Sequence, residues 1–140
     1  MRSVIGLWFF LVWPVVASDT ASVRRATVEV VIDGDTVTLD SGETIRLAGI
    51  NTPEIKSGQP FAAVAQQYLK QRVHNRQVLV ENATDPVDPY DRTLAYLYTL
   101  DGASLQLALL EEGFASAIVI APNDRYLDKY AAAETRARIA

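Results

Sequence analysis

Oxygen-bearing side chains gather at two places in the sequence where an extended segment ends. Asp35 lies at the first, and Asn51, Thr52 and Glu54 lie at the second. Oxygen ligands without histidine or cysteine favour calcium or magnesium over zinc. The sequence therefore indicates a site for a hard divalent cation.

Two arginines, Arg46 and Arg92, add guanidinium groups to these oxygens. The guanidinium is the side-chain group best suited to bidentate phosphate recognition. Cleavage of a phosphodiester needs a base to activate water, a cation to bridge the phosphate oxygens, and donors for the charge that develops on phosphorus. Glu54, a cation at Asp35 and the two arginines can supply these functions in turn.

Each of these residues also has a purely structural interpretation. Asp35, next to Gly34, is typical of a hairpin turn, and Glu54, after a proline, is typical of a helix start. Arg46 by itself is an outward-facing strand residue, and Arg92 a charge at the start of a strand. Their joint presence at this spacing favours the functional interpretation.

The segments that must hold these residues begin with a run of strands. Hydrophobic and polar residues alternate between Thr27 and Ile50, with turn signals at Asp33-Gly34 and Ser41-Gly42. This pattern predicts three short antiparallel strands. Apolar residues then recur at intervals of three and four over 61–73, which predicts an amphipathic helix starting near Pro60.

The second half of the chain adds the remaining elements. We expect a strand over Gln77–Glu81, a loop over Asn82–Asp91 and a strand over Arg92–Leu100. A helix over Ser104–Glu112 and an extended piece over Ser116–Ile120 follow. The loop contains two prolines that oppose regular pairing, and its aspartates are expected to be solvated. Asn123 or Asp124 can cap a last helix, in which Leu127, Tyr130 and Ala131 face inward.

Five strands with a helix between the third and the fourth predict an α+β fold. The expected architecture is a small antiparallel β-barrel of the oligonucleotide/oligosaccharide-binding (OB) type with three α-helices. The 140 residues, 49% of them hydrophobic, suit one globular domain. The sequence has no cysteine, so a disulfide framework and a thiolate metal site are excluded.

Residues 1–17 have the pattern of an export signal. Arg2 precedes an apolar run from Val4 to Val16, and small residues then allow cleavage after Ala17. The alternative is an uncleaved membrane anchor, but this run contains a proline and is shorter than the roughly 20 residues that span a bilayer. We therefore expect an exported protein, periplasmic or secreted, without stable membrane association after cleavage.

The expected mature domain covers 18–140, with its core at about 27–138. Without the leader, 12 basic residues face 17 acidic ones, which gives a net charge of -5. This balance opposes tight, extended contact with nucleic-acid phosphates, although it leaves room for a small local site. We expect a monomer.

Three segments, in order, resemble the signature segments of the staphylococcal nuclease-like (thermonuclease) family. They are DGDT at Asp33–Thr36, IRLAGINTPE at Ile45–Glu54 and YDRTLAY at Tyr90–Tyr96. The match runs from about Val28 to the last expected helix. The resemblance implies a five-stranded barrel with three helices and a calcium-dependent (Ca2+) phosphodiesterase that acts on DNA or RNA.

The resemblance also implies a role for each site residue. By position, Asp35 matches the calcium-binding aspartate, and Thr52 matches the threonine whose backbone carbonyl joins the ion. Glu54 matches the general base, and Arg46 and Arg92 match the two phosphate-binding arginines. All are of the residue type that the family pattern predicts.

The chain departs from the family pattern at a few positions. Asn51 replaces an aspartate that usually binds calcium, and its amide oxygen can coordinate without adding charge, so we expect weaker metal binding. Over 118–120, tyrosines that stack on a base are absent, which removes roughly 1–3 kcal/mol per base, while Tyr90 remains to contact the substrate. Asp91 stands where glycine is common, and we expect a small effect if its backbone is left-handed.

Two functions from different classes fit these observations. The first is an exported calcium-dependent nuclease in which water activated by Glu54 attacks the phosphodiester in line. The second is a catalytically weak or inactive OB-type module that binds nucleic acid or protein. Intact Glu54, Arg46 and Arg92 favour the enzyme, because a binding module has no need of an acid-base residue there.

Overall fold

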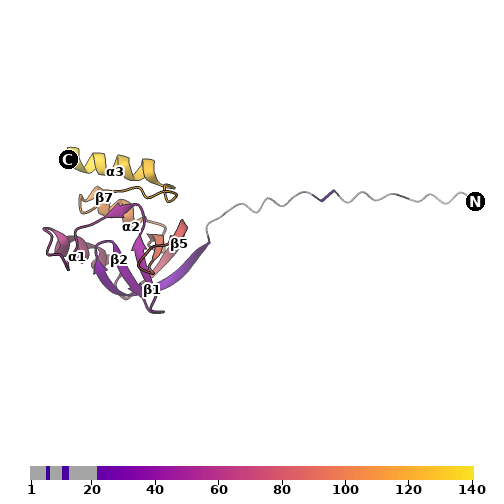
Figure 1. Ribbon diagram of the computed structural model, residues 1–140, viewed down its shortest axis with the longest axis horizontal. Coiled ribbons are helices and arrows are strands. Elements are labelled where there is room, and N and C mark those ends of the chain that lie inside the picture. Colours follow the sequence, from indigo (N-terminus) through magenta and orange to yellow (C-terminus); the bar gives the residue numbers. More distant parts are fainter. Residues whose placement is uncertain (1–5, 7–10, 13–21) are drawn as a thin grey trace, which may run out of the picture.

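A computed structural model of the chain describes residues 22–140 together with Gly6, Leu11 and Val12 (Figure 1). The predicted export signal at 1–17 and its cleavage point lie outside the described residues, apart from those three positions. Over the described ranges, no helix is both long enough and apolar enough to cross a membrane.

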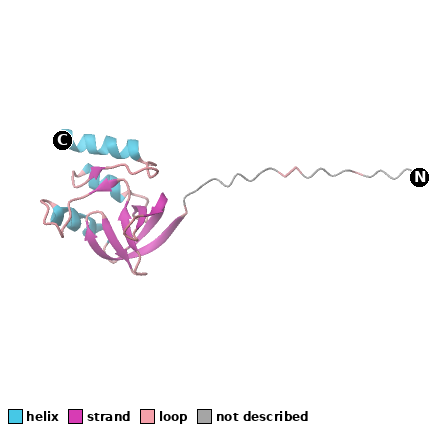
Figure 2. Cartoon of the chain, viewed as in Figure 1, coloured by secondary structure: helices cyan, strands magenta, loops and turns pink. Residues whose placement is uncertain are grey.

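The described part of the chain is built on a closed five-stranded barrel with the strand order β1-β2-β3-β6-β5 (Figure 2). The strands are β1 (Val23–Asp33), β2 (Thr36–Leu39), β3 (Thr44–Leu47), β5 (Gln77–Val87) and β6 (Thr93–Tyr98). The predicted barrel is therefore confirmed. It is mixed rather than wholly antiparallel, because β3 and β6 pair in parallel. The long crossover between these two strands permits that direction.

The described residues also form three helices and a small two-stranded sheet. The helices are α1 (Ala62–Val73), α2 (Leu105–Glu111) and α3 (Leu127–Ile139), and the small sheet pairs β4 (Ile50–Asn51) with β7 (Ser116–Ala117). α3 packs against α2 and lies farther from the barrel (Figure 1). The prediction of three helices is confirmed.

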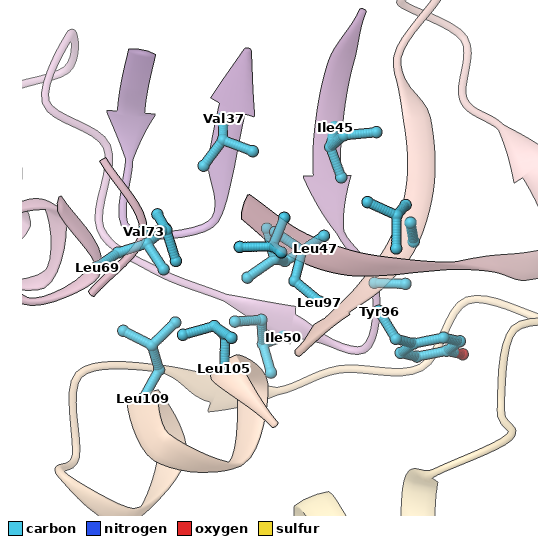
Figure 3. Close-up of a cluster of buried hydrophobic side chains, with 14 of the residues drawn as sticks. Val37, Ile45, Leu47, Ile50, Leu69, Val73, Tyr96, Leu97, Leu105 and Leu109 are labelled. Atoms are coloured by element: carbon cyan, nitrogen blue, oxygen red, sulfur yellow. The ribbon is translucent and has the colours of Figure 1, made fainter. Parts of the chain in front are cut away.

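Branched aliphatic side chains fill the space between the barrel and the helices. Alternate residues of a strand point to the same side, so Val37 and Ile45 both point into the barrel, where each is fully buried. Leu69 of α1 and Leu105 of α2 close the cluster from outside the strands (Figure 3). The alternation in the sequence thus gave the correct inward face.

β5 is longer than the sequence predicts. It extends to Val87 through a stretch that was expected to be loop, and Pro86 lies inside it. The register with β6 shifts between Asn82 and Val87, so β5 bulges there. Proline is tolerated at such a bulge because its missing N–H is not needed for pairing.

The last helix begins later than predicted. Asn123 does not cap it, because its side chain bonds to the main chain of Asp85, and the helix starts at Leu127. Tyr130 is buried as expected, but Leu127 and Ala131 are exposed. The predicted inward face was therefore wrong in part, because the residues of the helix that are buried are Tyr130 and Ala133.

Gln106 is a fully buried amide that the sequence pattern did not single out. Its Nε2 donates to the carbonyl oxygens of Ala48, at 3.2 Å, and Ala95, at 3.1 Å. Its Oε1 accepts from the N–H of Leu97 at 3.1 Å. The side chain thus ties α2 to β6 and to the turn that follows β3.

Replacing Gln106 with leucine is expected to lower the free energy of unfolding by about 2–4 kcal/mol, because buried main-chain groups lose their partners. Chemical denaturation monitored by circular dichroism measures the change. Gln67→Leu, at an exposed position of α1, is the matched control and should change stability little. Equal stabilities for both variants would contradict this role of Gln106.

Candidate active site

The turn between β1 and β2 holds Asp35 against the segment after β4. A Cβ at Gly34 would lie 2.8 Å from the Cβ of Ala65 and 3.0 Å from Oγ1 of Thr52, so the close approach requires glycine. Asp35 is buried, and its Oδ2 accepts from the N–H of Thr52 at 2.9 Å. Its Oδ1 accepts from the hydroxyl of Thr36 at 2.9 Å. The two signature segments therefore meet at this carboxylate.

Arg46 extends from β3 into the turn that leads to β4. Its Nη1 donates to the carbonyl oxygens of Leu47 and Ile50, at 2.6 and 2.9 Å. Its Nη2 lies 3.2 Å from Oδ2 of Asp35 and donates to Oδ1 of Asn51 at 3.2 Å. One nitrogen of Arg46 thus joins two of the predicted cation ligands.

Two positive charges act on the same region. Burial lowers the pKa of Arg46, the carboxylate of Asp35 opposes this effect, and the charge of Arg92 adds to it. A guanidinium remains protonated under such a shift. The effect of Arg92 on Arg46 indicates that the two guanidinium groups lie near each other, and guanidinium groups are suited to bind an anion such as phosphate.

Arg92 is held by a buried aspartate that the sequence placed in a solvated loop. Oδ2 of Asp88 accepts from Nε of Arg92 at 2.6 Å, and Oδ1 accepts from the main-chain N–H groups of Tyr90 and Arg92, each at 2.9 Å. The interpretation of Asp88 as solvated was wrong. An aspartate that bonds the N–H two residues later is a local turn signal that could have identified it.

The environment of Asp88 keeps it ionised. Burial raises its pKa, but the hydrogen bonds from the main chain and side chain of Arg92 and from the main chain of Tyr90 outweigh burial and lower the pKa below its usual value. In the described part of the chain, the terminal nitrogens of Arg92 have no hydrogen-bond partner. Arg92 therefore keeps them available for a ligand.

Asp91 has a left-handed backbone, with φ of 60°, which aspartate tolerates.

Glu54 lies in an exposed turn that its neighbours organise. The hydroxyl of Ser57 donates to Oε2 of Glu54 at 2.8 Å, and the N–H of Glu54 donates to Oε1 of Gln59 at 3.0 Å. Oδ1 of Asp33 accepts from the N–H of Ile55 at 2.9 Å. The sequence pattern did not reveal these contacts, which leave the carboxylate open to water.

A pocket of about 580 Å³ lies beside these residues. Arg46, Arg92 and Tyr90 are among the residues that line it, and Val87, Pro89, Ile118 and Ile120 supply apolar lining. Asp35 and Asn51 contact Arg46, but they are not among the lining residues, and neither are Glu54 and Thr52. The structure thus brings the two arginines together at one pocket and places the predicted base in the turn two residues after Thr52, whose N–H bonds to Asp35.

The residues near Asp35 fit a hard cation in type. They offer a carboxylate at Asp35, an amide oxygen at Asn51 and the carbonyl oxygen of Thr52, all of the class that calcium prefers. Oγ1 of Thr52 is buried without a hydrogen-bond partner among the described residues, and such a group is often satisfied by an ordered water or an ion. The described ranges contain no group of three or more histidine, cysteine, aspartate or glutamate residues placed to hold a metal. These three donors bring only one full negative charge.

Comparisons with known proteins find a matching family model and similar relatives. The family model described as Staphylococcal nuclease homologue matches residues 44–140. The chain is 39% identical over 103 residues to Thermonuclease from Staphylococcus intermedius, and the aligned residues make up 69% of this chain and 61% of that protein. It is 36% identical over 123 residues to Endonuclease YncB from Bacillus subtilis, and here the aligned residues make up 81% of this chain and 58% of that protein. This chain therefore spans about three fifths of the length of these two relatives.

Proposed function

The chain belongs to the staphylococcal nuclease family, and from that premise we propose that it is a calcium-dependent nuclease that hydrolyses phosphodiester bonds of DNA or RNA. The observation that carries the proposal is the pair of arginines on one pocket, Arg46 and Arg92. Glu54, in the turn two residues after Thr52, supplies the base. This combination of donors and base suits phosphoryl transfer.

The arginines bind the phosphate that is cleaved. Arg46 is fixed through Nη1 by the carbonyl oxygens of Leu47 and Ile50, and its Nε, which has no hydrogen-bond partner among the described residues, can donate to the phosphate. Arg92 is fixed through Nε by Asp88 and presents its terminal nitrogens. Preorganised donors of this kind stabilise the charge that develops on the phosphate oxygens in the transition state.

Glu54 accepts the proton of the attacking water. Its exposed carboxylate is reached by water, and the hydroxyl of Ser57 holds one of its oxygens. Asp35, Asn51 and the carbonyl oxygen of Thr52 would hold the calcium ion, which supplies Lewis-acid polarisation of a phosphate oxygen. In-line attack then requires the water at Glu54 and the leaving oxygen of the substrate to lie on opposite sides of the phosphorus atom, and the P–O bond to that oxygen breaks as the bond to water forms.

The pocket next to the arginines receives the nucleotide. Its apolar lining offers Ile118 and Ile120 to the base, and Tyr90, which also lines it, contributes an exposed aromatic ring. Within this proposal the protein is exported to the periplasm or secreted, acts as a monomer and does not remain associated with a membrane. The export pattern of 1–17 supports this location.

The neutral amide at Asn51 is expected to limit calcium affinity. Asn51→Asp adds a second carboxylate beside Asp35, so it should lower the calcium dissociation constant, because the affinity of such sites follows ligand charge. Isothermal titration of calcium into both proteins measures the effect. Equal dissociation constants would contradict the role of Asn51 as a ligand.

The proposed activity is tested with single-stranded DNA, duplex DNA and RNA in calcium, in magnesium and with a chelator. Cleavage of at least one substrate that requires calcium supports the nuclease. Binding of oligonucleotides without cleavage at any calcium concentration would contradict it and favour the binding module. Fluorescence anisotropy with a labelled oligonucleotide, run on the same samples, separates the two outcomes.

A further inference from the structure

Asn123 joins two distant segments through its side-chain amide. Its Nδ2 donates to the carbonyl oxygen of Asp85 at 2.9 Å, and its Oδ1 accepts from the N–H of Asp85 at 2.8 Å. Asn123 is only 7% exposed. The amide thus forms a closed pair of hydrogen bonds with the main chain of one residue of β5.

These bonds satisfy main-chain groups that the barrel leaves free. The ladder between β5 and β6 pairs Asn82 and then Val87, and skips the residues between them. A buried N–H or C=O without a partner is costly. The side chain of Asn123 therefore pairs with the N–H and C=O of Asp85, as the main chain of a neighbouring strand does elsewhere in the sheet.

The two segments each contribute one wall of the pocket, and Asp85 and Asn123 themselves line it. Val87 and Tyr90 follow Asp85 on one wall, and Ile118 and Ile120 precede Asn123 on the other. The second wall is itself anchored, because the N–H of Ile118 donates to the carbonyl oxygen of Gly49 at 3.0 Å.

The turn that carries Asn123 is closed as well. The N–H of Asn123 donates to the carbonyl oxygen of Ile120 at 2.8 Å. Asn123 is thus held through its main chain as well as through its side chain.

We propose that Asn123 is a positioning residue that sets the width of the pocket and so the fit of the substrate nucleotide. The inference rests on the proposed nuclease function for its substrate and deepens it by assigning a determinant of substrate fit. Asn123 has no hydrogen bond to Glu54, Asp35 or Arg46. It therefore affects substrate binding more than the chemical step, because a preformed pocket reduces the ordering cost of binding.

Steady-state cleavage of a short single-stranded oligonucleotide by Asn123→Ala tests this effect. KM is expected to rise roughly five- to tenfold, while kcat stays within about twofold. Val73→Ala, in the fully buried contact of α1 with the barrel, is the control for a general loss of stability and should leave KM unchanged. A wild-type KM for Asn123→Ala, or the same rise in both variants, would overturn the proposal.

A distance measurement tests the pocket width without activity. The sequence has no cysteine, so Val87→Cys and Ile120→Cys, both 64% exposed in the native protein, place one spin label on each wall. Asn123→Ala is expected to broaden the distance distribution measured by double electron–electron resonance. An unchanged distribution would refute the positioning role. If the parent protein cleaves nothing, the nuclease proposal fails, and this measurement alone decides the role of Asn123.

Hydrogen exchange of the unaltered protein covers the case in which Asn123→Ala does not fold. The amide hydrogen of Asp85 is expected to exchange slowly, because it is donated to Oδ1 of Asn123. Exchange at the rate of an unstructured peptide would show that this bond does not persist, and the proposal would then be wrong.

Discussion

Replacing Glu54 with glutamine is expected to lower kcat by roughly 10²- to 10⁴-fold, the range that a positioned general base contributes. Glutamine keeps the size of the side chain and an oxygen that can accept from Ser57, as Oε2 of Glu54 does. It cannot accept a proton from water. Because Glu54 does not line the pocket, the KM for the oligonucleotide should change little. Single-turnover cleavage under saturating calcium measures the effect on the chemical step.

The matched control is Glu29→Gln, which removes the same charge from an exposed position of β1. Its kcat should equal that of the parent protein, since a distant surface charge is screened by salt. If both variants keep full activity, Glu54 is not the base. If both lose activity equally, the effect comes from net charge rather than from proton transfer.

Replacing Arg46 with lysine is expected to reduce kcat/KM by roughly 10²- to 10³-fold, the cost of removing one donor to a developing oxyanion. Lysine keeps the positive charge but not the planar fork. In the native protein, Nη1 is bound by two main-chain carbonyl oxygens, while Nη2 lies against Asp35 and Asn51. A single ammonium group cannot fill both positions, so Asp35 is left less well paired and the phosphate loses an oriented donor.

Arg24→Lys is the matched control for this change. Arg24 pairs with Glu43 through contacts of 2.7 and 2.6 Å on the outside of the barrel, away from the pocket. Partly exposed pairs of this kind contribute little to stability, so activity should be retained. Full activity of Arg46→Lys would mean that charge alone suffices and that the fork of Arg46 has no role in the transition state.

The fold was predictable because its signals are local. Val37 and Leu39, and likewise Ile45 and Leu47, are separated by one polar residue. Because alternate residues of a strand point to the same side, this spacing assigned the buried face of both strands correctly. The turn before Asp35 was also visible in the sequence. The resemblance to a known family then gave the order in which these pieces assemble.

The contacts that complete the site were not predictable, because they join residues far apart in the sequence. Gln106 bonds to Ala48, and Asn123 bonds to Asp85, with no periodic pattern at either position. The length of β5 was missed for a related reason. A bulge stabilised by a distant side chain overrides the local tendency of Pro86 to end a strand.

The site also contains a relationship that residue types alone do not show. Arg46 was expected to bind phosphate and Asn51 to bind the cation, yet the two side chains bond to each other. The carboxylate of Asp35 contacts the same nitrogen of Arg46, Nη2. Phosphate and cation binding therefore involve groups in direct contact, and a change at Asn51 is expected to affect both.

Calcium-dependent cleavage of one end-labelled, single-stranded DNA oligonucleotide by the purified protein tests the central claim most directly. We expect shortened products in calcium, none in the presence of a calcium chelator, and recovery of cleavage when excess calcium is restored. Cleavage at the same rate with and without the chelator would contradict it. So would intact DNA, together with intact RNA of the same sequence, at every calcium concentration.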